Sequence, residues 1–123
     1  MGVINWEKTE EARKDPHIIN FLKWARENGC IDEAIQFPIC FGKDGGLVGV
    51  AASRPIGANE PFILVPEKLC IDDAKAKASP CGKIFLENPD VFEDIDDADY
   101  NRLVFYVTYE ITKGEKSFWY PYF

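Results

Sequence analysis

The sequence contains a single histidine, His17, and its four cysteines include no C-x-x-C pair. Protein zinc sites are built from clusters of such ligands, so we predict no metal site. A lone histidine also weakens every mechanism that needs a histidine base. In the absence of a secretory leader, we expect reduced and partly buried thiols at Cys30, Cys40, Cys70 and Cys81.

Long apolar runs and basic patches are also missing. No run approaches the roughly 20 residues that span a bilayer, so we expect no membrane partner and a cytoplasmic or nuclear location. Fourteen basic residues face twenty-one acidic ones, which gives a net charge of −7. Without a dominant basic patch, direct binding to nucleic acid is not expected.

The negative charge is local. Residues 87–99 contain seven acids and no lysine or arginine. Such a run can attract a basic peptide or simply form a solvated loop before a helix. The spacing does not match a calcium-binding EF-hand loop, and Asp96 or Asp97 is better used as a helix N-cap.

The chain has 123 residues, of which 46% are hydrophobic, so we expect a folded globular unit. After a polar lead-in at 1–14, the first expected helix covers 15–29. Asp15 and Pro16 form its start, and Gly29 ends it. The fold class predicted from all the elements is α+β.

Residues 35–71 form the expected strand region. Strands at 35–41 and 47–52, joined by a glycine-rich turn, indicate a hairpin, with Pro38 at an edge or bend. The apolar run 62–65 is bounded by Pro61 and Pro66 and is predicted to be a buried strand. Residues 69–71 are a candidate for a further short strand.

Helices dominate the expected structure of residues 72–123. Asp72 caps a short helix at 73–78, and residues 80–90 stay ambiguous. Residues 97–113 have helical spacing and a following Gly114, so helix is favoured over strand despite the β-branched residues.

The C-terminal segment is unusually aromatic. Because aromatic side chains gain free energy when buried, the segment either folds back, covers a partner or continues into further chain. A partner-binding role is therefore predicted for Phe118, Trp119, Tyr120, Tyr122 and Phe123.

Glycines gather in the hairpin, at 42, 45, 46 and 49. The pattern is neither a P-loop nor a dinucleotide-binding fingerprint, because a strand rather than a helix follows. Glycines in a strand indicate either a plain hairpin or a close approach of backbone to ligand.

Four segments, in order, carry a family resemblance. They are FLKWARENG at 21–29, GLVGVAASRPI at 46–56 with NE at 59–60, ILVPEKLCI at 63–71, and YE at 109–110 with GEKSFWYPYF at 114–123. Together they resemble the N-terminal part of SET-domain protein methyltransferases of the Rubisco large-subunit lysine methyltransferase type.

The resemblance implies a cofactor, S-adenosylmethionine, held through the backbone of Gly46, Leu47, Val48 and Gly49. Leu47 stands where the family's G-x-G pattern has its first glycine. Residues 72–123 would open a helical insert. The family's Asn-His-Ser segment and late tyrosine do not occur in this sequence, so we assign no catalytic residue.

The resemblance therefore implies the N-terminal portion of a lysine or histidine methyltransferase that is inactive as this isolated chain. Its expected partner is a protein substrate or the remainder of a SET domain. The alternative is a non-enzymatic interaction module that uses the aromatic segment. Self-association of two copies through open strand edges and the aromatic segment is a further interpretation.

Overall fold

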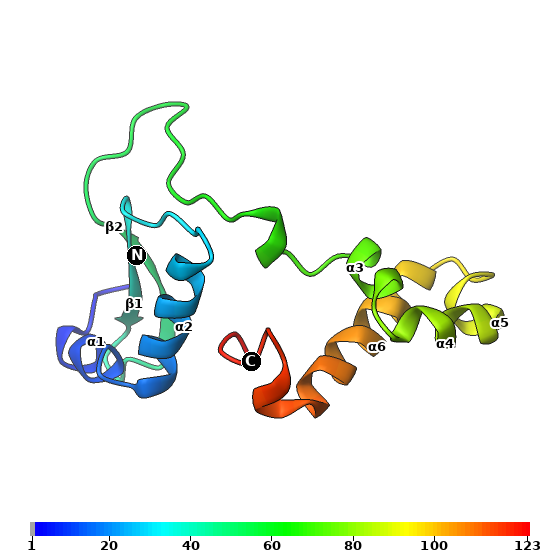
Figure 1. The fold of residues 1–123 in the computed structure, drawn as a ribbon. Coiled ribbons are helices and arrows are strands. Elements are labelled where there is room, and N and C mark those ends of the chain that lie inside the picture. The colour runs from blue at the N-terminus through cyan, green and yellow to red at the C-terminus, as the bar shows by residue number, and fades with distance from the viewer. Residues whose placement is uncertain (1) are drawn as a thin grey trace. The chain divides into compact units, whose positions relative to one another are not determined.

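The computed structural model describes residues 2–123, and the chain divides between Leu69 and Cys70 into two compact units. Helices occur in both units, and a two-stranded antiparallel sheet lies in the first (Figure 1). The predicted α+β class is confirmed. Within residues 2–123, no helix has both the length and the apolar character needed to cross a membrane.

The first unit begins with two capped helices. α1 (Trp6–Ala12) starts at Asn5, whose side chain accepts a hydrogen bond from the Lys8 amide at 3.0 Å. This helix lies within the segment that we expected to be a polar lead-in. α2 (Pro16–Glu27) starts at Asp15 as predicted, and Gly29 follows its end with φ +96°.

The predicted hairpin is confirmed. β1 (Ile35–Phe41) pairs antiparallel with β2 (Leu47–Ala52), so that Cys40 lies opposite Val48. The register is irregular between Gln36 and Ile39, the interval that contains Pro38. A proline has no amide hydrogen for the ladder, which explains an irregularity at this point.

Both helices pack against β1. The Phe21 ring of α2 lies 6.1 Å from the Phe37 ring in an edge-to-face arrangement. From α1, the buried Thr9 hydroxyl accepts a hydrogen bond from the Cys40 amide at 2.9 Å. Ile39 is fully buried beside them. The core of this unit therefore lies between the helices and the first strand.

The predicted buried strand at 62–65 is wrong. Leu64 forms only an isolated bridge with Ile31, and all four side chains of the segment are exposed. Pro61 and Pro66 remove amide donors on both sides, so the ladder cannot extend. The short strand expected at 69–71 is also wrong: Leu69 ends the 3₁₀ helix Glu67–Leu69, and residues 70–71 belong to no strand.

The second unit is helical. α3 (Asp73–Ala78) starts at Asp72, whose carboxylate accepts from the Lys75 amide at 2.7 Å as predicted. The ambiguous region becomes α4 (Cys81–Glu87) and α5 (Pro89–Phe92). The long helix is confirmed as α6 (Ala98–Thr112), followed by a 3₁₀ turn at Gly114–Lys116. Asp97 is its N-cap residue, but makes no side-chain capping bond.

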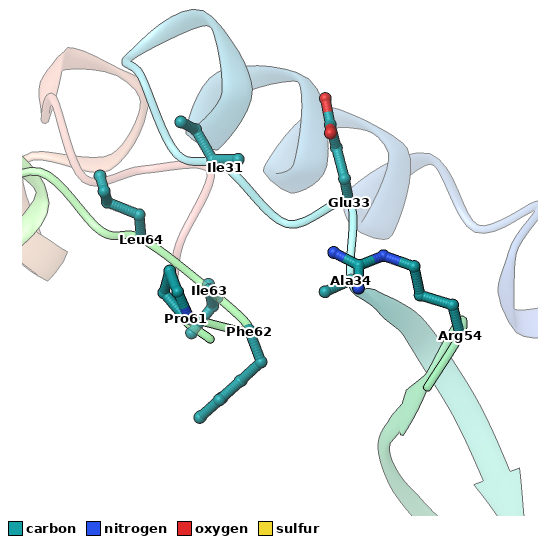
Figure 2. A pocket seen from close by; sticks show the side chains of 8 residues that line it. All are labelled: Ile31, Glu33, Ala34, Arg54, Pro61, Phe62, Ile63 and Leu64. Atoms are coloured by element: carbon teal, nitrogen blue, oxygen red, sulfur yellow. The ribbon is translucent and has the colours of Figure 1, made fainter. Parts of the chain in front are cut away.

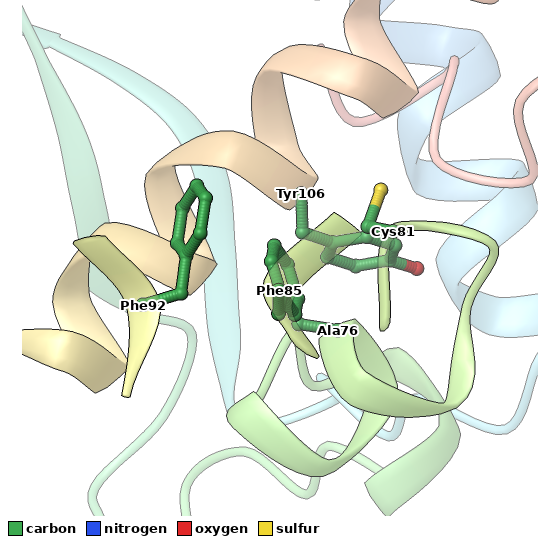
Figure 3. Packing of buried hydrophobic residues seen from close by; sticks show 5 residues of the cluster. All are labelled: Ala76, Cys81, Phe85, Phe92 and Tyr106. Atoms are coloured by element: carbon green, nitrogen blue, oxygen red, sulfur yellow. The ribbon is translucent and has the colours of Figure 1, made fainter. Parts of the chain in front are cut away.

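Aromatic rings fill the core of this unit (Figure 3). The rings of Phe85 and Phe92, both labelled in Figure 3, lie 4.8 Å apart. The Phe105 ring meets both of them edge-on. The buried cluster brings α3, α4, α5 and α6 together through Ala76, Cys81, Phe85, Phe92 and Tyr106.

Candidate functional site

The turn between the two strands depends on glycine. Gly42 and Gly45 have φ values of +87° and +68°, a region that favours glycine. Gly45 also packs closely on α1, because an added Cβ would lie 2.6 Å from the Lys8 Cβ. The turn therefore needs glycine at this position for both its backbone angle and its packing.

Residues near the start of the chain form hydrogen bonds with the same turn and with the end of β1. The Asn5 amide donates to the Cys40 carbonyl at 2.8 Å, and the Asn5 side chain donates to the Lys43 carbonyl at 2.9 Å. The Gly42 amide donates to the Val3 carbonyl at 2.9 Å. This contact occupies the outer edge of β1. In the described part of the chain, β2 pairs with β1 alone.

The four candidate cofactor residues lie where the turn enters β2. The Gly46 amide donates to the Asp44 carboxylate at 3.3 Å. Leu47 and Val48 are 68% and 51% exposed. Gly49 lies beneath a neighbouring ring, because an added Cβ would stand 3.1 Å from Cε2 of Phe41. The segment thus has exposed residues at Gly46–Val48 and a glycine covered by a ring at its end.

This chemistry is compatible with S-adenosylmethionine. Gly46 and Gly49 carry no side chains of their own, although the Phe41 ring lies against Gly49, and the nearby Asp44 carboxylate carries the sign that suits a sulfonium cation. Leu47 and Val48 offer apolar surface. Three hollows in the described part of the chain are lined by residues other than these four.

One of these hollows, of about 140 Å³, is lined partly by residues that come after β2 in the sequence (Figure 2). In Figure 2, the 61–64 segment lies on one side of it, and Glu33, Ala34 and Arg54 lie on the other. The Arg54 guanidinium pairs with the Glu60 carboxylate at 2.5 Å, and the Gly57 amide donates to the same carboxylate at 2.9 Å. These bonds hold the pKa of Glu60 below its ordinary value and raise the pKa of Arg54.

Sequence reasoning missed this ion pair. The available signal was an arginine and a glutamate at the two ends of a Pro/Gly turn, which is weak because surface charges are common.

A neighbouring hollow of about 410 Å³ is lined in part by Arg26 and Asp32, which form a bidentate pair. Hydrogen bonding by Arg26 lowers the pKa of Asp32, and burial raises the pKa of the Cys30 thiol.

The predicted partner-binding segment divides into buried and exposed parts. Trp119 is buried, and its Nε1 donates to the Tyr106 hydroxyl at 3.2 Å. The Ser117 hydroxyl donates to the buried Glu110 carboxylate at 2.5 Å, which fixes the start of the segment on α6. Side chains that are 45–58% exposed are Phe118, Tyr120, Tyr122 and Phe123.

Comparison with known proteins gives the chain its relatives. It is 30% identical over 112 residues to the actin-histidine N-methyltransferase of Gallus gallus, and 29% identical over 114 residues to those of Homo sapiens and Rhinolophus ferrumequinum. Its homologues are histidine methyltransferases. The alignments cover 91–93% of this chain, which spans 18% of the length of these curated relatives. No family model and no solved structure gave a significant match.

Proposed function

We propose that the chain forms the N-terminal part of an S-adenosylmethionine-dependent protein methyltransferase with a SET domain of the Rubisco large-subunit lysine methyltransferase type. The observation that carries the proposal is similarity to actin-histidine N-methyltransferases over 91–93% of the chain. The matched region includes the exposed glycine segment that the family resemblance assigns to the cofactor.

In this proposal, Gly46–Gly49 contact the cofactor through their backbone. S-adenosylmethionine supplies the methyl group, which its sulfonium makes transferable to a nucleophile. The chain contributes position rather than proton transfer, because glycines let the backbone approach the bound group and Asp44 adds a carboxylate at the turn.

The acceptor is a lysine or histidine side chain of a protein, and the names of the relatives make an actin histidine the first substrate to test. The isolated chain is expected to be inactive. Its lone histidine, His17, lies in the first turn of α2, and neither an Asn-His-Ser segment nor a late tyrosine occurs in the sequence. The remainder of a SET domain is then the partner that completes the site.

A nuclear magnetic resonance titration with S-adenosylmethionine tests the cofactor role. We expect the amide signals of Gly46–Gly49 to shift, with weak affinity in the millimolar range for a single wall. Val48→Arg places a cation at an exposed position, where it would repel the sulfonium of the cofactor, and should therefore reduce the shifts of these amide signals. Ile19→Arg, at a similarly exposed position on α2, should not. Shifts confined to Cys70–Phe123 would contradict the assignment.

Methyl transfer is measured separately, by incubating the pure chain with labelled cofactor and actin. The expected result is no incorporation above a blank without protein. Robust incorporation would overturn the proposed inactivity while leaving the family assignment intact.

The aromatic segment favours a second candidate function, a non-enzymatic interaction module. Ser117 and Trp119 fix the segment on α6, while Phe118, Tyr120 and Tyr122 stay 45–58% exposed. Anchored aromatic side chains are typical of interface hot spots. Self-association is directly testable by light scattering, where a dimer has twice the 14.0 kDa of the chain. A Phe118→Ser/Tyr122→Ser variant should then return to the monomer mass, and a monomeric wild-type chain would exclude self-association.

A further inference from the structure

An open apolar groove runs along one face of the second unit, between α4, α5 and α6. It encloses about 610 Å³. Ile84, Val91 and Val104 contribute to its lining and are 39%, 44% and 48% exposed. Tyr100 and Thr112 also line the groove and lie near the two ends of α6. This spacing along α6 corresponds to about 18 Å at 1.5 Å per residue.

The walls of the groove are fixed by contacts beneath them. The Asn101 side chain of α6 donates to the Val91 carbonyl of α5 at 2.9 Å. The Phe92 and Phe105 rings lie 5.4 Å apart and join the same two helices. The groove is therefore part of the packed helical unit, and a ligand does not have to create it.

The acidic run lies at one end of this groove. α5 and the first turn of α6 contribute both lining residues and acids, because Asp90 precedes Val91 and Asp99 precedes Tyr100. Within residues 2–123, Lys83 and Arg102 are the cations in ion-pair distance of the run, and they meet Glu87 and Glu93. The remaining acids are exposed and pair with none of the described cations: Asp90, Asp94, Asp96, Asp97 and Asp99.

We propose that this groove binds an amphipathic helix of a partner protein, with an apolar stripe in the groove and lysine or arginine residues beside the acidic run. A helix presents apolar side chains at i, i+3, i+4 and i+7, and about 18 Å accommodates roughly three of its turns. Uncompensated acids beside the groove favour basic flanks and repel acidic ones. This inference does not rest on methyl transfer.

The probe is a fluorescently labelled 18-residue helical peptide with leucines along one face and lysines on both flanks. Two matched peptides replace every lysine by glutamate or every leucine by serine. Anisotropy with the wild-type chain should show binding of the first peptide, weakened by salt, and at least about tenfold weaker binding of the other two.

Variants then locate the binding. Val104→Glu should weaken the first peptide at least about tenfold, because it places a carboxylate in the groove. Val104→Thr is a milder variant with an expected intermediate loss, and circular dichroism checks that both remain helical. Ile19→Glu, on the exposed face of α2 in the other unit, is the matched control and should bind within about twofold of wild type.

Charge is tested in the same way. The triple change Asp90→Asn/Asp94→Asn/Asp97→Asn should reduce both affinity and salt dependence. The triple change Glu7→Gln/Glu27→Gln/Glu33→Gln alters the net charge equally in the other unit and should not. The proposal would be overturned if the two triple variants had equal effects, or if Val104→Glu left peptide binding unchanged. It would also be overturned if the wild-type chain formed a dimer that Val104→Glu dissociates.

Discussion

Replacing Arg102 by methionine should destabilise the helical unit strongly. Arg102 is 6% exposed, and its guanidinium grips the Asp73 carboxylate through two bonds of 2.5 and 3.1 Å. It also donates to the Phe92 carbonyl and lies 3.4 Å from Glu93. One side chain therefore ties α3 and the α5 end to α6.

The magnitude follows from what the substitution leaves behind. Removing one partner of a buried ion pair costs about 3–5 kcal/mol. The loss should fall at the lower end, about 3 kcal/mol, because Asp73 is 30% exposed and keeps the Lys77 ammonium at 2.9 Å. That loss is a large fraction of the stability of a small domain.

Urea unfolding followed by circular dichroism at pH 7 measures the effect. Lys83→Met is the matched control, because its ion pair with Glu87 is solvent-exposed and should contribute less than about 0.5 kcal/mol. An Arg102→Met chain as stable as the control would refute the reasoning, since it would mean that the methionine packs as well as the ion pair binds.

The same contact predicts a pH dependence. The hydrogen bonds from Arg102 hold the pKa of Asp73 below its ordinary value of 3.8. A carboxyl whose pKa is lower in the folded state stabilises the fold above pH 4 and loses that contribution as the pH falls further. Between pH 7 and pH 3, wild type should therefore lose more stability than Arg102→Met. Equal losses of stability in the two chains would contradict the effect of Arg102 on the pKa of Asp73.

Three further substitutions test other contacts by urea unfolding. Thr9→Val keeps the side-chain shape but leaves a β1 amide without its acceptor, and should cost about 2 kcal/mol; an unchanged midpoint would contradict that bond. Tyr106→Phe removes the acceptor of the buried Trp119 Nε1 and should cost about 1–2 kcal/mol, with a changed tryptophan emission as a second readout. Gly82→Ala would drive its Cβ into a backbone carbonyl at the end of α3 and should cost about 3 kcal/mol, whereas Gly57→Ala has room and should stay within about 0.5 kcal/mol.

Local signals predicted much of the secondary structure. Asp15 with Pro16, Asp72, and the glycines after α2 and α6 act on their immediate neighbours, so their effect can be recognised in the sequence itself. The hairpin could also be predicted from the sequence, because its glycine turn separates two segments rich in β-forming residues.

Elements that depend on distant partners were missed. α1 is short and mostly charged, and it is held by Asn5 and Thr9 contacts to β1 that no local pattern reveals. The 62–65 run has the composition of a core strand, but a strand needs a neighbour with which to pair, and here Ile31 supplies one bridge.

The candidate site shows the same division. Sequence reasoning proposed residues 46–49 as a cofactor segment, which stays a prediction, and the structure adds that Gly49 lies beneath the Phe41 ring. It did not locate the Arg54–Glu60 pair or the groove along α6, because both arise from side chains brought together by folding.

The exposed run 62–65 has a further consequence for the life of the chain in a crowded cell. Four consecutive apolar residues of high β-propensity are a template on which unfolded chains can stack into intermolecular sheets. Pro61 and Pro66 act as gatekeepers, because neither can donate a backbone hydrogen bond to an added strand. The segment with which another chain can form backbone hydrogen bonds is thereby confined to four residues. The same prolines that prevent a longer strand in the folded chain also protect against aggregation.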